Sequence, residues 1–178
     1  MDSGLRRDIE WDCSRVVIQF YNNLDAKQYD DLVDLFEADG VWKRQGKELE
    51  GQAAIMAAMQ ARGEFLVIRH VVTNIQIIVE DENNASSAEY VTIYRFDSEE
   101  KLDGPAPLDG PGVIFLYQDK LVRTDSGWKI KDKRGRPIMV KKNKIKKIRS
   151  PEIIQGSGIK NLFFGSAYFQ DMWFNTAP

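Results

Sequence analysis

A single histidine and one aspartate carry most of the chemistry that this sequence could perform. His70 is the only histidine among 178 residues, and it lies in the β-branched run FLVIRHVVTNIQIIVE that begins at Phe65. Asp25 follows the apolar end of the first helical segment. A carboxylate that accepts the Nδ1 proton of an imidazole orients the ring and leaves Nε2 as a base. Such a pair would support proton abstraction beside a carbonyl, followed by elimination or isomerisation, without a metal or a cofactor.

Other polar side chains are candidates for contact with a substrate. Strand alternation places Asn74 on the same face as His70, where its amide could hold a substrate oxygen. Tyr21 lies one helical turn before Asp25 and could donate a hydrogen bond into the site. If the corresponding face of the next strand points inward, it adds Tyr90, Thr92 and Tyr94 to the wall of a cavity.

The composition favours a soluble globular enzyme or binding protein and excludes several classes. The chain is 43% hydrophobic and 29% charged, with one cysteine and one histidine, so neither an internal disulfide nor a His- or Cys-rich metal site is expected. No apolar run has the length of a membrane span, and the N-terminal residues lack a signal-peptide pattern. We therefore expect a cytoplasmic protein that binds a small molecule and no membrane.

Charge is distributed unevenly along the chain. The body is acidic, whereas the region after residue 140 begins with the basic run KKNKIKKIR. This run is short and has no interleaved aromatic residues, which is more typical of a solvated edge than of a nucleic-acid interface. We expect no nucleic-acid partner.

Hydrophobic periodicity predicts three helices and a sheet. Apolar residues spaced by three and four predict a helix over residues 5–24, a short second helix within 26–36, and a third from Gly51 to Gly63. Residues 37–40 are expected to form a turn, and the predicted strands are 41–43, 65–80, 87–96, 113–124 and 128–140. This order predicts an α+β domain over residues 1–140, in which a curved antiparallel sheet wraps over three N-terminal helices as a cone-shaped barrel with an internal cavity.

The last part of the chain, residues 141–178, differs in character. A basic run is followed by a glycine-containing segment and then by many aromatic residues. Exposed aromatic residues favour aggregation, so this segment is expected to be buried as a lid over the cone or at a subunit interface, or to be an appendage.

Three stretches together resemble a known family. The segment YNNLDAKQYDDLVDLFEADGVWK, the helix start GQAAI and the strand RHVVTN are similar to the SnoaL-like branch of the nuclear transport factor 2-like superfamily, over about residues 5–140. The resemblance implies the α+β cone and, in several lyases of the branch, a catalytic dyad that matches Asp25 and His70. It also implies a polar substrate-binding residue near Arg136 or Arg134, and a homodimer or homotrimer.

Two other catalytic arrangements of the superfamily fit less well. Limonene epoxide hydrolase uses carboxylates from the later strands, and no pair of acidic side chains is expected on one face of those strands here. Ketosteroid isomerase uses a tyrosine and an aspartate, for which Tyr21 is only a loose match. The resemblance therefore predicts a cofactor-independent lyase or isomerase for a small, largely apolar cyclic metabolite. The alternatives are a non-catalytic ligand-binding or dimerisation module and a polyketide-type cyclase that uses the same base.

Overall fold

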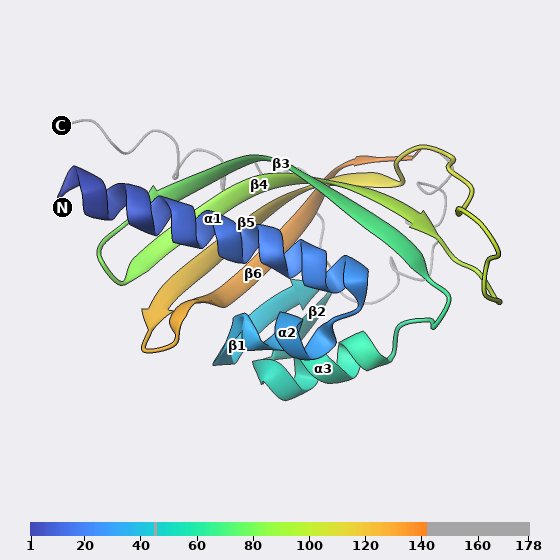
Figure 1. Ribbon diagram of the computed structural model, residues 1–178, viewed down its shortest axis with the longest axis horizontal. Coiled ribbons are helices and arrows are strands. Elements are labelled where there is room, and N and C mark those ends of the chain that lie inside the picture. Colours follow the sequence, from blue (N-terminus) through green and yellow to red (C-terminus); the bar gives the residue numbers. More distant parts are fainter. Residues whose placement is uncertain (45, 142–178) are drawn as a thin grey trace, which may run out of the picture. The chain divides into compact units, whose positions relative to one another are not determined.

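Three helices pack against a curved, six-stranded sheet that is not closed into a complete barrel (Figure 1). The computed structural model describes residues 1–44 and 46–141, and the predictions for the tail concern residues beyond this range. The elements are α1 (Ser3–Ala26), α2 (Tyr29–Asp34), β1 (Phe36–Arg44), β2 (Lys47–Glu50), α3 (Gly51–Gln60), β3 (Val67–Val79), β4 (Asn84–Phe96), β5 (Val113–Thr124) and β6 (Gly127–Val140). The predicted α+β class is confirmed.

The helix α1 positions Asp25 opposite the start of β3. Its first turn is capped by Asp2, whose carboxylate accepts from the backbone N–H groups of Gly4 at 2.9 Å and Leu5 at 3.2 Å. Its apolar side is buried against the sheet, and α1 lies across one face of the strands (Figure 1). The helix ends at Lys27, which adopts the left-handed conformation with φ 59°. Asp25 thus lies in the last turn of a well-anchored helix.

The sheet is mixed, so the expectation of an entirely antiparallel sheet was wrong. The strand order is β2-β1-β6-β5-β4-β3, and β1 runs parallel to β6, with Trp42 opposite Lys133. The predicted turn at residues 37–40 instead belongs to β1, where the register with β6 shifts between Phe36 and Val41. A parallel pair needs a long connection, and here α3 and four strands separate β1 from β6.

A bulge in β3 places Asn74 outside the site. Asn74 has φ 54° and lies where the pairing with β4 shifts, between Thr73 and Gln76. Before the bulge Val72 shares the inner face with His70, and after it Ile75 packs against the core while Asn74 is exposed. The prediction that Asn74 lies on the face of His70 was therefore wrong, because one irregular residue exchanges the two faces.

The predicted tyrosine face of β4 points away from α1. His70 pairs with Ile93, and its neighbour Arg69 pairs with Tyr94. Cross-strand partners share a face of the sheet, so Tyr94 lies on the outer face. The same alternation places Thr92 and Tyr90 there, and Tyr90 is 41% exposed. The prediction that Tyr90, Thr92 and Tyr94 line the interior was wrong.

Arg136 also lies on the outer face. It is exposed and pairs with Leu116 of β5. The inward residues of β6 are Lys133, which is fully buried, and Gly135, which faces Tyr117. The inward-facing positions near the end of β6 are therefore held by Lys133 and Gly135, and Arg136 lies on the face opposite His70.

Replacing Gly135 by alanine should destabilise the fold. A Cβ at this position would lie 2.5 Å from the ring of Tyr117, a distance that forces the ring or the strand to move. We expect a loss of about 1–3 kcal/mol in the free energy of unfolding, measured by urea titration. Gly104→Ala is the control, because a Cβ there meets no atom within 4 Å; equal stability of the two variants would contradict the packing described.

Candidate active site

Asp25 and His70 form a direct hydrogen-bonded pair between α1 and β3. Asp25 Oδ1 lies 2.5 Å from Nδ1 of the imidazole, and Oδ2 accepts the backbone N–H of His70 at 2.7 Å. The side chains are only 6% (His70) and 15% (Asp25) exposed. With Nδ1 donating to the carboxylate, the neutral ring carries its lone pair on Nε2. The contact expected from the sequence is present, and both carboxylate oxygens are used to hold one residue.

Tyr21 supports the imidazole through its ring. The two rings are 5.5 Å apart between centroids and tilted by 38°. The Tyr21 hydroxyl donates to Glu89 Oε1 at 3.3 Å. Burial, reinforced by the negative charge of Glu89, raises the pKa of Tyr21 well above its ordinary value. Tyr21 is thus a packed, protonated donor to Glu89, and the hydroxyl is not presented to a substrate as the sequence suggested.

A buried ionic cluster lies beneath Tyr21, and the sequence prediction missed it. Lys133 Nζ lies 2.6 Å from Asp119 Oδ2 and 3.5 Å from Glu89 Oε1, and all three side chains are 0% exposed. Ser87 Oγ donates to the other oxygen of Glu89 at 2.9 Å. The expectation that the later strands carry no acidic pair on one face was wrong, since Glu89 of β4 and Asp119 of β5 both point inward. Their position among alternating apolar residues was the signal that could have found them.

The cluster holds two carboxylates for one ammonium group. Lys133 Nζ also lies 4.4 Å from the ring centroid of Phe20 and 4.7 Å from that of Tyr21, which favours the cationic form. Burial raises the pKa of Asp119 to about 7, although Lys133 acts to lower it. Burial alone would lower the pKa of Lys133, but Asp119 and Glu89 raise it above its ordinary value. Burial thus favours the protonated form of the Asp119 carboxyl.

The Asp119 carboxyl should make stability depend on pH. Its folded pKa of about 7 exceeds the ordinary value of 3.8, so the native state keeps a proton that the unfolded chain releases. This contribution is fully present below the unfolded pKa and is lost as the pH rises through the folded pKa. Urea titrations of the wild type and Asp119→Asn should show the wild type losing stability relative to the variant between about pH 4 and about pH 7. Asp125→Asn, in an exposed turn, should show no such trend, and a pH-independent difference for Asp119→Asn would contradict the assignment.

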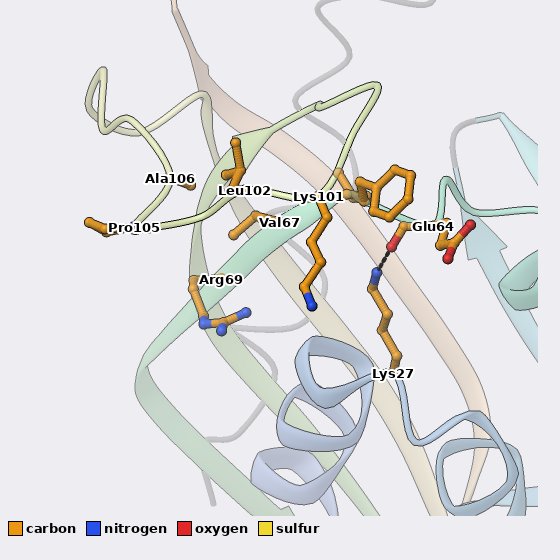
Figure 2. A pocket seen from close by; sticks show the side chains of 11 residues that line it. Lys27, Glu64, Val67, Arg69, Lys101, Leu102, Pro105 and Ala106 are labelled. Atoms are coloured by element: carbon orange, nitrogen blue, oxygen red, sulfur yellow. Dashed lines mark hydrogen bonds between the residues drawn. The ribbon is translucent and has the colours of Figure 1, made fainter.

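A separate basic pocket lies beside the start of β3 (Figure 2). Its volume is about 410 Å³, within the range of small-molecule sites. Lys101 and Arg69 point into a common space, and Lys27 donates to the backbone oxygen of Glu64 (Figure 2). Arg69 lies on the face of β3 opposite His70, and the residues that line this pocket include neither member of the Asp25–His70 pair.

The comparisons with known proteins identify the family. Residues 7–134 match the SnoaL-like domain, and the chain belongs to this family. No curated protein matches the sequence.

Solved structures confirm the fold. A protein named "Putative Scytalone Dehydratase" from Novosphingobium aromaticivorans is 20% identical, with 79% of this chain and 91% of that chain aligned at a TM-score of 0.66. Hexachlorocyclohexane dehydrochlorinase LinA-type3 from Novosphingobium barchaimii is 15% identical, with 79% of this chain and 93% of that chain aligned at a TM-score of 0.63. An NTF2-like protein with a cystatin-like fold, also from Novosphingobium aromaticivorans, is 16% identical, with 83% of this chain and 94% of that chain aligned at a TM-score of 0.62.

The described residues contain neither a membrane-spanning helix nor a cluster of metal-binding side chains. No helix within residues 1–44 and 46–141 is long and apolar enough to cross a membrane. Over the same residues, no group of three or more His, Cys, Asp and Glu side chains is placed to hold a metal ion.

Proposed function

We propose that this protein is a cofactor-independent lyase or isomerase that acts on a small cyclic carbonyl compound, with His70 as general base and acid and Asp25 as its orienting carboxylate. The observation that carries the proposal is the double attachment of Asp25, which binds Nδ1 of the ring at 2.5 Å and the His70 backbone N–H at 2.7 Å. This arrangement fixes the orientation of the ring and leaves Nε2 available to accept a proton from a substrate.

The chemistry follows from the basic Nε2 atom. It would remove a proton from the carbon next to the substrate carbonyl, and the electron pair of that bond would become part of a new carbon–carbon double bond. In a dehydration, the hydroxyl on the neighbouring carbon leaves with the bonding electrons and takes the proton back from Nε2 as water. In an isomerisation, the same proton returns to a different carbon. The imidazolium formed between these steps is stabilised by the Asp25 carboxylate.

The family supports the reaction class of this proposal, a lyase that acts on a small molecule. SnoaL-like folds aligned here include proteins named as a dehydratase and a dehydrochlorinase, which are names for elimination reactions. Fold similarity does not by itself transfer an activity. For this chain, the Asp25–His70 geometry supports the proposed elimination.

A substrate screen tests the proposed function. Cyclic β-hydroxy ketones would be incubated with the full-length protein, and the conjugated enone product would be followed by its ultraviolet absorbance. Proton exchange next to the carbonyl would be followed in D₂O by NMR in the same samples, since exchange reports abstraction even when elimination is slow. A compound turned over by the wild type and not by His70→Ala supports the proposal. Compounds that bind without exchange or turnover would favour the non-catalytic binding module, and exchange with carbon–carbon bond formation would favour the cyclase.

We also propose that the protein forms a homodimer or homotrimer through the outer face of the sheet. The support is the set of apolar side chains exposed there, which includes Val71 at 48%, Ile78 at 42% and Tyr90 at 41%. Sedimentation equilibrium of the full chain measures the oligomeric state. A monomer at all concentrations would contradict this proposal.

A further inference from the structure

Two arginines lie near the Asp25–His70 pair. Arg62 follows α3, and its Nη1 donates to the carbonyl oxygen of Leu24 at 3.4 Å, the residue before Asp25. Its guanidinium carbon is 5.8 Å from the ring centroid of Tyr29. Arg44 ends β1, and its guanidinium carbon is 5.4 Å from the ring centroid of Trp42. Each guanidinium therefore lies against an aromatic ring, and that of Arg62 is also bound to the end of α1.

Neither guanidinium has an anionic partner in the described part of the chain. The contacts of Arg44 and Arg62 are aromatic rings and one backbone carbonyl, and Arg62 Nε is buried without an acceptor among the described residues. Burial, followed by repulsion from Arg62, lowers the pKa of Arg44, and burial likewise lowers that of Arg62. Two half-buried positive charges that form no ion pair with a described residue are costly to hold. An anion bound between them would remove this cost.

The two arginines and the dyad belong to one neighbourhood. Arg62 is close enough to Asp25 for that carboxylate to act on its pKa, and Arg44 is similarly influenced by Tyr117. The Tyr117 ring lies 5.9 Å from the Tyr21 ring, which in turn packs on His70. Arg62 thus lies at the end of α1 that carries Asp25, and Arg44 is close enough to Arg62 to be repelled by it.

We propose that the small molecule on which His70 acts carries a carboxylate, which Arg44 and Arg62 bind while the half-buried ring of Tyr29 contacts its apolar body. This inference rests on the proposed function and narrows its substrate class. Guanidinium groups match the planar geometry of a carboxylate and donate charge-assisted hydrogen bonds to it. An anion held beside the dyad would also fix which carbon of the substrate faces the base.

Binding of matched probes tests the proposal without any need for turnover. The probes are naphthoate and cyclohexane carboxylate, each compared with its neutral primary amide, and binding to the full-length His70→Ala variant is measured by calorimetry. We expect each carboxylate to bind at least about tenfold more tightly than its amide, the difference typical of one charge-assisted contact. Arg44→Met and Arg62→Met should each remove about this factor, because methionine keeps much of the apolar stem.

The controls separate this inference from its rivals. Arg123→Met, at an exposed position of β5, should bind the carboxylates unchanged, and circular dichroism would establish that each variant is folded. Equal binding of acid and amide, or no carboxylate binding at millimolar concentration, would overturn the proposal. Loss of binding in Lys101→Met with none in Arg62→Met would also overturn it, since the anion would then occupy the basic pocket. If the carboxylates bind tightly but the wild type turns over no substrate, the proposed catalysis is contradicted while the carboxylate-binding site is supported.

Discussion

Replacement of His70 by alanine should reduce turnover by about 10²- to 10⁴-fold, the usual contribution of a positioned general base. The expected loss is in kcat more than in KM, because the imidazole acts on the proton that moves in the transition state. The variant should remain folded, since the hydrogen bond from the backbone N–H of residue 70 to Asp25 does not depend on the imidazole. Wild-type turnover by the His70→Ala variant would contradict a catalytic role for the Asp25–His70 pair.

Asp25→Asn should lower turnover to a comparable degree and also change the tautomer of His70. The carboxylate accepts the Nδ1 proton, whereas an amide can donate to Nδ1 and favour the tautomer protonated at Nε2. Because His70 is the only histidine, its ¹⁵N shifts report the tautomer without ambiguity. Asp30→Asn, an exposed residue of α2, should leave both turnover and tautomer unchanged. Loss of activity without a tautomer change would point to a purely structural role for Asp25.

Lys133→Met should destabilise the fold by about 3–5 kcal/mol, the usual effect of removing one partner of a buried ionic group. The variant would leave Glu89 and Asp119 fully buried without their ammonium partner. Urea unfolding of the full chain measures the change. Lys120→Met is the matched control, because Lys120 is next to Asp119 in β5 but exposed, and it should change stability by less than about 0.5 kcal/mol.

A double variant tests whether the cluster acts as a unit. Asp119→Asn added to Lys133→Met should cost less than the sum of the two single changes, because the second substitution removes a carboxylate that the first left uncompensated. Additive effects would mean that Lys133 is stabilised mainly by the rings of Phe20, Tyr21 and Tyr117, which surround its ammonium group.

Local patterns in the sequence were sufficient to predict α1 and β3, whereas the pairing of Asp25 with His70 was implied by the family resemblance. Apolar residues spaced by three and four define the buried side of α1, and Asp25 follows at its end. The β-branched run identifies β3 and places His70 near its start. These features depend on neighbouring residues, so periodicity and capping chemistry describe them well.

The errors arose where distant segments determine the outcome. The bulge at Asn74 exchanged the faces of β3, and the choice of inner face on β4 depends on which side α1 covers. The parallel pairing of β1 with β6, which brings Trp42 opposite Lys133, is likewise set by long-range pairing. Strand alternation separates two faces without saying which is buried, and this explains the misplacement of Tyr90, Thr92, Tyr94 and Arg136.

The two bonds made by Asp25 have a mechanical consequence for the sheet. β3 is an outermost strand, the kind most prone to slip by a residue or to recruit a foreign strand. Asp25 binds both the backbone N–H and the ring of His70. A one-residue shift in the register of β3 would therefore break both hydrogen bonds and move the imidazole to the opposite face of the sheet. The end of α1 therefore fixes the register of the edge strand β3. The hydrogen-exchange rate of the His70 amide would measure the free energy of opening these bonds, and slow exchange is expected.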